Sequence, residues 1–137
     1  RLLNPMREVE ALSDLCGQAD IVLIDAPCSG TGTWRRNPEA RWRLTPDRLS
    51  RLTALQARLM DVAAELVKPG GRLVYAVCSL LPEEGSAQAD AFLNRHPGWQ
   101  PSPLPLDVAG ADQGQMLLTP RRHGCDGFFI AAAIAPC

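Results

Sequence analysis

Four consecutive branched apolar residues at positions 21–24 (Ile-Val-Leu-Ile) stand between Asp20 and Asp25. A short apolar run enclosed by charged residues is typical of a strand that is buried on both faces in a parallel sheet. A second run of this kind occupies positions 72–77. Between the two runs, from about Pro46 to Lys68, apolar side chains recur every three or four residues, which predicts an amphipathic helix. This order of strand, helix and strand predicts an α/β fold with a parallel pair joined by a right-handed crossover.

The remaining segments extend this pattern. Residues 5–15 and 82–95 predict two further helices. Prolines interrupt positions 97–114 repeatedly, so we expect mostly loop there. Two short apolar runs, at positions 115–119 and 128–134, flank a segment rich in turn-forming residues. They predict an antiparallel pair at the edge of the sheet.

The chain has 137 residues, enough for one domain, and its formal net charge of −1 excludes a polybasic protein. Any surface that binds nucleic acid must therefore be a local patch. No apolar run reaches the length of about 18 residues that a membrane-spanning helix needs. The first residues contain no apolar stretch of the signal-peptide type, so we expect a cytoplasmic protein with no membrane partner.

The cysteines are odd in number and widely spaced: Cys16, Cys28, Cys78, Cys125 and Cys137. None belongs to a Cys-x-x-Cys pair, and the two histidines do not stand at ligand spacing. We therefore expect neither a metal site nor a disulfide framework, and reduced thiols are the default. The missing Cys-x-x-Cys pair also disfavours a thiol-dependent redox enzyme.

Chemically reactive side chains follow both expected strands. Asp25 and Cys28 come at the end of the first strand, and Cys78 comes directly after the second. Ligands bind beyond the carboxyl ends of the strands in sheets of this type, so we expect the three side chains to converge on one cleft. Gly30 and Gly32 let the backbone approach a ligand closely. Their Gly-x-Gly pattern is weak as a phosphate loop, because it lacks both the P-loop lysine and the third glycine of a dinucleotide-binding loop.

Three segments resemble the motifs of one family, the RNA cytosine-5 methyltransferases of the Nol/Nop/Sun type. Positions 25–33 (Asp-Ala-Pro-Cys-Ser-Gly-Thr-Gly-Thr) resemble its Asp-Ala-Pro-Cys motif. Positions 77–84 (Val-Cys-Ser-Leu-Leu-Pro-Glu-Glu) resemble its second motif, in which a threonine usually stands where this chain has Val77. Positions 126–131 (Asp-Gly-Phe-Phe-Ile-Ala) resemble its C-terminal motif. The three segments occur in the family's order and span most of the chain.

This resemblance implies transfer of a methyl group from S-adenosylmethionine to C5 of cytidine in RNA, with bacterial ribosomal RNA as the expected partner. It assigns Cys78 as the nucleophile that adds to C6 of the base, and Cys28 as the residue that helps to resolve the covalent adduct. Asp25 is expected to hydrogen-bond the cytosine edge and also to contact the cofactor. An analogy with DNA cytosine methyltransferases, which use a Pro-Cys dipeptide, would make Cys28 the nucleophile instead.

The resemblance also implies a fold and its extent. We expect residues 1–137 to form the C-terminal half of a Rossmann-like S-adenosylmethionine-dependent methyltransferase domain, with parallel strands ending in an antiparallel pair. The family's glycine-rich cofactor loop and the acid that holds the ribose lie upstream of the Asp-Ala-Pro-Cys motif, and neither is found in this sequence. The alternative function is therefore an inactive module that serves only in RNA binding or assembly.

The segment at positions 34–43 carries a local charge of +3 on this nearly neutral chain. We expect its arginines to bind RNA phosphates, and its two tryptophans offer rings on which a base can stack. The alternative is a solvated loop whose second tryptophan packs on the following helix. The arginines are Arg35, Arg36, Arg41 and Arg43.

Overall fold

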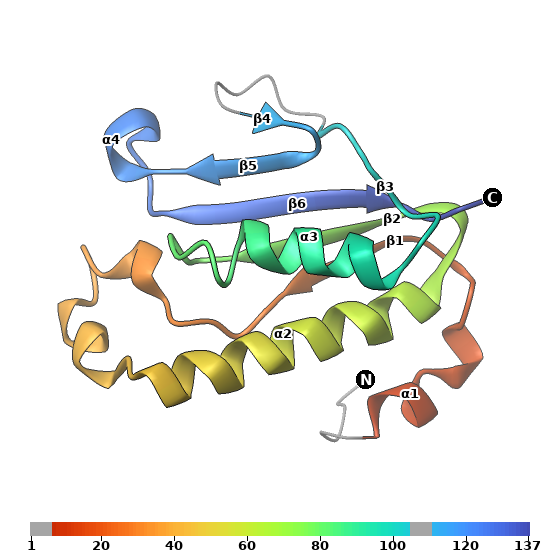
Figure 1. Ribbon diagram of the computed structural model, residues 1–137, viewed down its shortest axis with the longest axis horizontal. Coiled ribbons are helices and arrows are strands. Elements are labelled where there is room, and N and C mark those ends of the chain that lie inside the picture. The colour runs from red at the N-terminus through yellow and green to blue at the C-terminus, as the bar shows by residue number, and fades with distance from the viewer. Residues whose placement is uncertain (1–6, 105–110) are drawn as a thin grey trace.

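A computed structural model describes residues 7–104 and 111–137 of the chain (Figure 1). Its α-helices are α1 (Glu8–Ala11), α2 (Pro46–Leu66), α3 (Ser86–Arg95) and α4 (Pro120–His123), and short 3-10 turns cover 13–15, 31–33 and 38–43. The strands are β1 (Ala19–Asp25), β2 (Val67–Val77), β3 (Gln100–Pro101), β4 (Ala111–Asp112), β5 (Gln115–Leu118) and β6 (Phe128–Ile134). They form one sheet in the order β1-β2-β6-β5-β4, and β3 pairs with β6.

The sheet contains the predicted parallel pair and the predicted antiparallel pair. β1 and β2 run parallel, with Ile24 opposite Tyr75, and α2 is the crossover between them. β5 and β6 run antiparallel, with Met116 opposite Ile130. β6 is not an edge strand, however, because it lies between β2 and β5 and pairs antiparallel with both. The outcome is the mixed sheet of a Rossmann-like α/β fold.

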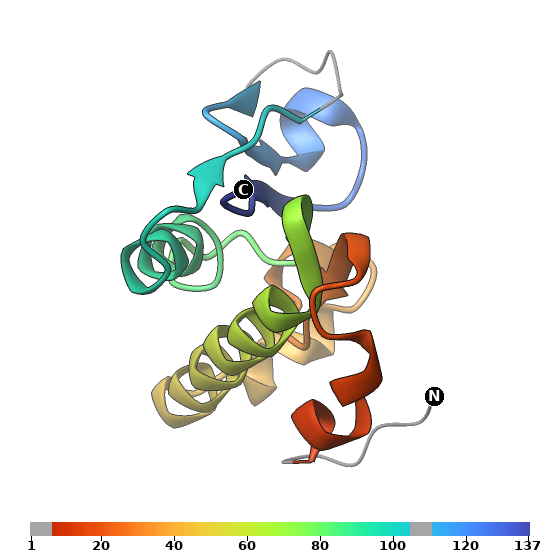
Figure 2. The ribbon, with the colours of Figure 1, turned by 90° about the vertical axis from the view of Figure 1, so that its right-hand side faces the viewer.

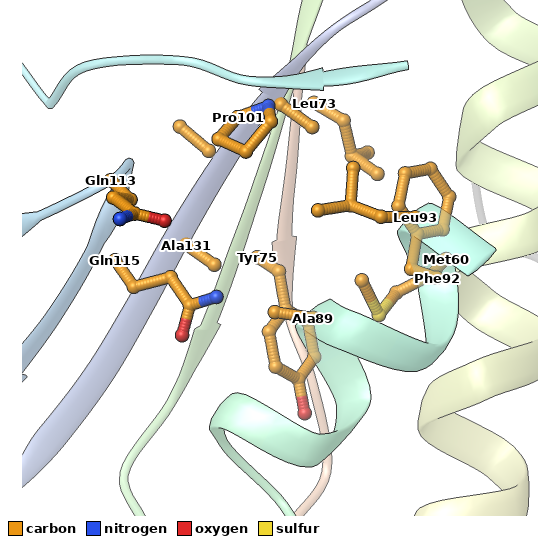
Figure 3. Close-up of a pocket in the computed structure, with 12 residues that line it drawn as sticks. Met60, Leu73, Tyr75, Ala89, Phe92, Leu93, Pro101, Gln113, Gln115 and Ala131 are labelled. Atoms are coloured by element: carbon orange, nitrogen blue, oxygen red, sulfur yellow. The ribbon is translucent and has the colours of Figure 1, made fainter. Parts of the chain in front are cut away.

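The core lies between the sheet and helices α2 and α3, which Figure 2 shows on the same side of the sheet. β2 contributes Leu73, Tyr75 and Val77, none of which is more than 1 % exposed. Met60 of α2 and Phe92 of α3 belong to the same cluster. Figure 3 shows the small apolar pocket that remains beneath α3. Its volume of about 20 Å³ and its mainly apolar lining identify it as a packing gap of the core.

The expectation that the first strand is buried on both faces is wrong for β1. Val22 and Ile24 pack against the core, but Ile21 and Leu23 are 62 % and 66 % exposed on the opposite face. α2 and α3 cover only the face that carries Val22 and Ile24. The apolar run therefore indicates the strand correctly, but not the burial of its second face.

Several expected boundaries also shift: the second strand, expected at 72–77, already begins at Val67. α2 begins as predicted, with Thr45 Oγ1 accepting a hydrogen bond from Arg48 N at 3.2 Å, but it ends at Leu66 because Val67 already has extended backbone. α3 begins at Ser86 rather than Pro82, since residues 82–85 form a turn.

The expected first helix is reduced to α1 and the 3-10 turn at 13–15, and residues 1–6 lie outside the described part. In the described part of the chain, no helix has the length and apolar character that would let it cross a membrane.

Candidate active site at the carboxyl ends of β1 and β2

The two cysteines expected in one cleft lie side by side. Cys28 Sγ is 3.3 Å from Cys78 Sγ, within hydrogen-bonding distance for two thiols. The parallel pairing of β1 and β2 positions them, because Ala26 N still donates to Ala76 O at 3.0 Å just before the chains diverge. Asp25 stands opposite Ala76, and it is exposed at the same end of the sheet. The structure thus brings Cys28 and Cys78 into contact, whereas Asp25 lies on the exposed face of β1 that also carries Ile21 and Leu23. The convergence of all three side chains on one cleft stays a prediction.

The three sequence motifs meet around this cysteine pair. Gly32 N donates to Cys78 O at 3.1 Å, and Gly127 N donates to Gly32 O at 2.9 Å. Figure 1 shows the loop after β1, the end of β2 and the start of β6 at the same end of the sheet. Gly32 is required here, since a Cβ atom on it would lie 2.0 Å from Gly127 O. The close crossing of two backbones explains this glycine without a phosphate ligand.

A buried carboxylate beneath the cysteines was not expected from the sequence. Glu84 is 0 % exposed, and its carboxylate accepts hydrogen bonds from Ser29 N at 2.8 Å and from Ser79 Oγ at 2.6 Å. The Ser29 hydroxyl also donates to it, as does Gln56 Nε2 at 3.1 Å. Ser29 follows Cys28 and Ser79 follows Cys78, so one carboxylate ties together the two loops that carry the thiols.

Apart from its place in the second family motif, Glu84 is interpreted from the sequence as an acid that favours a helix N-terminus. Residues 82–85 form a turn rather than the start of the helix. In this turn the Glu84 carboxylate lies within hydrogen-bonding distance of Ser29 and Ser79. The one sequence signal for this contact is that Glu84 follows Ser79 by five residues within the second motif.

Burial raises the pKa of the Cys28 thiol to about 12, and its hydrogen bond with Cys78 acts in the same direction. A hydrogen bond from the backbone of Gly30 opposes this shift but does not cancel it. Cys28 is therefore a protonated thiol near neutral pH and can donate a hydrogen bond to the sulfur of Cys78.

The arginines expected at an RNA surface fall into separate groups. Arg35 and Arg36 both form ion pairs with Asp126, with nitrogen–oxygen distances of 3.1 and 2.5 Å. The hydrogen bond from Arg36 is the largest cause that lowers the pKa of Asp126, and Arg35 adds to it. These two guanidinium groups nevertheless remain more than 60 % exposed. They link the loop after β1 to the start of β6 and leave hydrogen-bonding capacity toward solvent.

The other two arginines lie on the 3-10 turn at 38–43. The Arg41 guanidinium lies 4.4 Å from the ring centroid of Trp42, which is itself 75 % exposed. The expected alternative, in which Trp42 packs on the following helix, is therefore wrong. Trp34 is partly buried. Arg43 lines a cleft that also contains Cys28.

The described residues contain no group of three or more His, Cys, Asp or Glu side chains arranged to hold a metal ion.

A model of the family described as 16S rRNA methyltransferase RsmB/F matches residues 5–134. The chain belongs to the RsmB/F family. The family is S-adenosylmethionine-dependent, and its match takes in all three motifs that meet at the cysteine pair. The resemblance stated from the sequence is thereby confirmed, since RsmB/F proteins are of the Nol/Nop/Sun type.

Curated RsmB/F relatives are similar along most of the chain. Ribosomal RNA small subunit methyltransferase B of Thermus thermophilus is 45 % identical over 114 residues, which are 83 % of this chain and 29 % of the relative. The putative methyltransferase Rv1407 of Mycobacterium tuberculosis is 46 % identical over 125 residues, 88 % of this chain and 27 % of the relative. The chain thus spans less than a third of the length of these relatives.

Solved structures share the fold. The crystal structure of PH0851 superposes with a TM-score of 0.80 at 44 % identity, over 86 % of this chain and 27 % of that one. The structure of NSun6 from Pyrococcus horikoshii with SFG superposes with a TM-score of 0.79 at 24 % identity, over 97 % and 33 % of the two chains. Both confirm the Rossmann-like methyltransferase fold expected from the sequence.

Proposed function

We propose that this chain carries the cysteine chemistry of an S-adenosylmethionine-dependent enzyme that methylates C5 of cytidine in RNA, with ribosomal RNA as its substrate class. The observation that carries the proposal is the pair of thiols, Cys28 and Cys78, 3.3 Å apart at the carboxyl ends of adjacent parallel strands. Membership of a family of 16S rRNA methyltransferases supports the substrate class. The reduced thiols that this chemistry requires fit a cytoplasmic protein.

Cys78 is the proposed nucleophile. C5 of cytosine is weakly nucleophilic, and addition of the Cys78 thiolate to C6 makes C5 an enamine carbon that accepts a methyl group. The Cys28 thiol supports this role, because it can donate a hydrogen bond to the Cys78 sulfur and so stabilise its thiolate. The raised pKa of Cys28 disfavours its thiolate and so disfavours Cys28 as the nucleophile.

Cys28 is the proposed group for resolving the adduct. After methyl transfer, the proton on C5 must leave before the bond between C6 and the Cys78 sulfur can break. Once Cys78 is bonded to carbon, burial still raises the pKa of Cys28, but the second cause, the hydrogen bond with the Cys78 thiol, is removed. The Cys28 thiol must first release its own proton to water, and as a thiolate it takes the proton from C5. The thiol formed in this way can then donate a hydrogen bond to the departing thiolate of Cys78.

Asp25 is the proposed contact to the cytosine edge and to the cofactor. When bound, the cofactor supplies a methyl group on a positively charged sulfonium. The exposed carboxylate of Asp25, at the end of β1, suits such a cation and can also accept a hydrogen bond from the cytosine edge. Within residues 7–104 and 111–137, we assign no further residue to the cofactor.

The proposed RNA contacts are the guanidinium groups of Arg35, Arg36, Arg41 and Arg43. The exposed ring of Trp42 adds a surface for base stacking. Arg35 and Arg36 keep their ion pairs with Asp126, and the N–H groups on the exposed side of each guanidinium contact the RNA phosphates.

The deciding experiment uses the full-length protein with unmethylated small-subunit ribosomal RNA and S-adenosylmethionine. Nucleoside mass spectrometry should detect 5-methylcytidine with the wild-type protein and none with Cys78→Ala. Cys16→Ala is the matched control, since Cys16 is exposed and lies outside the three motifs. A methyl group on another base or on ribose would refute the proposal. RNA binding with no methyl transfer would favour the alternative of an assembly module.

A further inference from the structure

A cleft opens directly beside Cys28. Its volume is about 200 Å³. The loop after β1 contributes Cys28, Ser29, Gly30 and Thr33 to its wall, and the turn at 38–43 with its neighbours contributes Asn37, Ala40, Arg43 and Leu44. Arg48, in the first turn of α2, completes the lining. Of the described residues that line the cleft, none is acidic.

The two arginines of this cleft, Arg43 and Arg48, form no ion pair within the described part of the chain, unlike other arginines nearby. Arg35 and Arg36 share Asp126, and Arg51 pairs with Asp47 on α2. Arg43 and Arg48 have no ion pair with any residue of the described chain, and both are exposed. The cleft therefore presents two guanidinium groups to an anion at the wall formed by Cys28.

The chemistry of the surroundings favours a phosphodiester as that anion. Guanidinium groups bind phosphate oxygens in pairs of parallel hydrogen bonds, and two of them can share one phosphate. The neighbour of Arg43 on the same turn is Trp42, whose exposed ring can hold a base. A cytidine placed against the cysteines has its own phosphates attached, so the backbone of its strand must pass close to this wall.

We propose that Arg43 and Arg48 form a phosphate-binding cleft for the RNA strand next to the target cytidine, which we call the Arg43–Arg48 cleft. This inference rests on the proposed function, since it assumes that the base is held at Cys28 and Cys78. It adds Arg48, which the sequence did not single out, and it separates Arg43 from the arginines that are paired with Asp126.

The test measures RNA binding by the full-length protein across a range of salt concentrations. The double variant Arg43→Ala/Arg48→Ala should bind RNA more weakly, and its slope of log affinity against log salt should fall by about 1 for each arginine removed. Arg51→Ala is the matched control, because Arg51 lies on the same helix, is exposed and is paired with Asp47. It should leave the affinity and the slope close to those of the wild type. Arg48→Lys should retain the slope but lose part of the affinity.

Two results would overturn the inference. One is a slope in the double variant equal to that of Arg51→Ala. The other is an unchanged RNA affinity with a raised KM for S-adenosylmethionine, which would assign the cleft to the cofactor's carboxylate. Because the binding measurement does not need catalysis, it remains decisive for the cleft even if the wild-type protein forms no 5-methylcytidine, the result that refutes the proposed function.

Discussion

Ser29 donates both its backbone N–H, at 2.8 Å, and its hydroxyl to the carboxylate of Glu84, which is 0 % exposed. The same carboxylate accepts from Ser79 Oγ at 2.6 Å. Each serine is the neighbour of one of the paired cysteines. The distance between Cys28 and Cys78 is therefore held by a hydrogen-bonded anchor below them as well as by the pairing of β1 with β2.

Replacing Glu84 by Ala should lower the free energy of unfolding by about 3 kcal/mol, because it leaves buried donors without their charged acceptor. Glu83→Ala is the matched control, since Glu83 is exposed one residue away, and it should change stability by less than about 0.5 kcal/mol. Urea denaturation of the full-length protein measures both. Equal losses in the two variants would show that the Glu84 anchor contributes nothing.

The convergence of the two cysteines could be predicted from the sequence, but their anchor could not. Carboxyl ends of adjacent parallel strands must meet, so Cys28 and Cys78 were expected together as soon as both strands were recognised. Glu84 reaches Ser29, 55 residues earlier in the chain, through a turn that local patterns do not specify. The same limit applies to Arg36, whose partner Asp126 lies 90 residues away.

The exposed face of β1 shows a second limit of sequence reasoning. The run Ile-Val-Leu-Ile indicates a strand because branched side chains suit extended backbone. Whether Ile21 and Leu23 are covered depends on which layers pack against the sheet, and the strand's own residues do not encode this. By contrast, Thr45 before Pro46 marked the start of α2 correctly, since a helix cap is a local interaction.

The protonation state of the Cys28 thiol predicts how its alkylation rate depends on pH. Burial raises its pKa, so its thiolate fraction stays small until the pH is well above the value near 8.5 of an ordinary thiol. In a Cys78→Ser variant of the full-length protein, which removes the neighbouring thiol but keeps the burial, alkylation of Cys28 by iodoacetamide should accelerate only above about pH 9. Peptide mass spectrometry measures the rate, with the exposed Cys16 as the reference thiol in the same sample. A Cys28 rate that levels off by pH 8 would contradict the protonated resting state.

Gly32 gives a prediction about the crossing of the motifs. A Cβ atom at this position would lie 2.0 Å from Gly127 O, so Gly32→Ala must push apart the loop after β1 and the start of β6. We expect a loss of about 3 kcal/mol in the free energy of unfolding and a strong loss of methyl transfer. Gly17→Ala is the control, since Gly17 has φ +66° but open space around it. It should cost about 1–2 kcal/mol and leave methyl transfer intact. Full activity in Gly32→Ala would show that the crossing does not position the thiols.

The two cysteines have separable roles, and a covalent RNA adduct distinguishes them. Cys78→Ala in the full-length protein should abolish both methyl transfer and the adduct, because the sulfur that bonds to C6 is gone. Cys28→Ala keeps that sulfur, so addition and methyl transfer proceed while elimination stalls, and a denaturation-resistant protein–RNA complex should accumulate.

A denaturing gel with RNA and S-adenosylmethionine, one lane for each variant, measures this directly, and Cys16→Ala should match the wild type. The 3.3 Å between the sulfurs makes the comparison stringent, because either thiol lies close enough to reach a base bound at the other. An adduct in the Cys78→Ala lane and none in the Cys28→Ala lane would exchange the two roles. The hydrogen bond would then run from Cys78 to a Cys28 thiolate, against the direction in which burial shifts the pKa of Cys28.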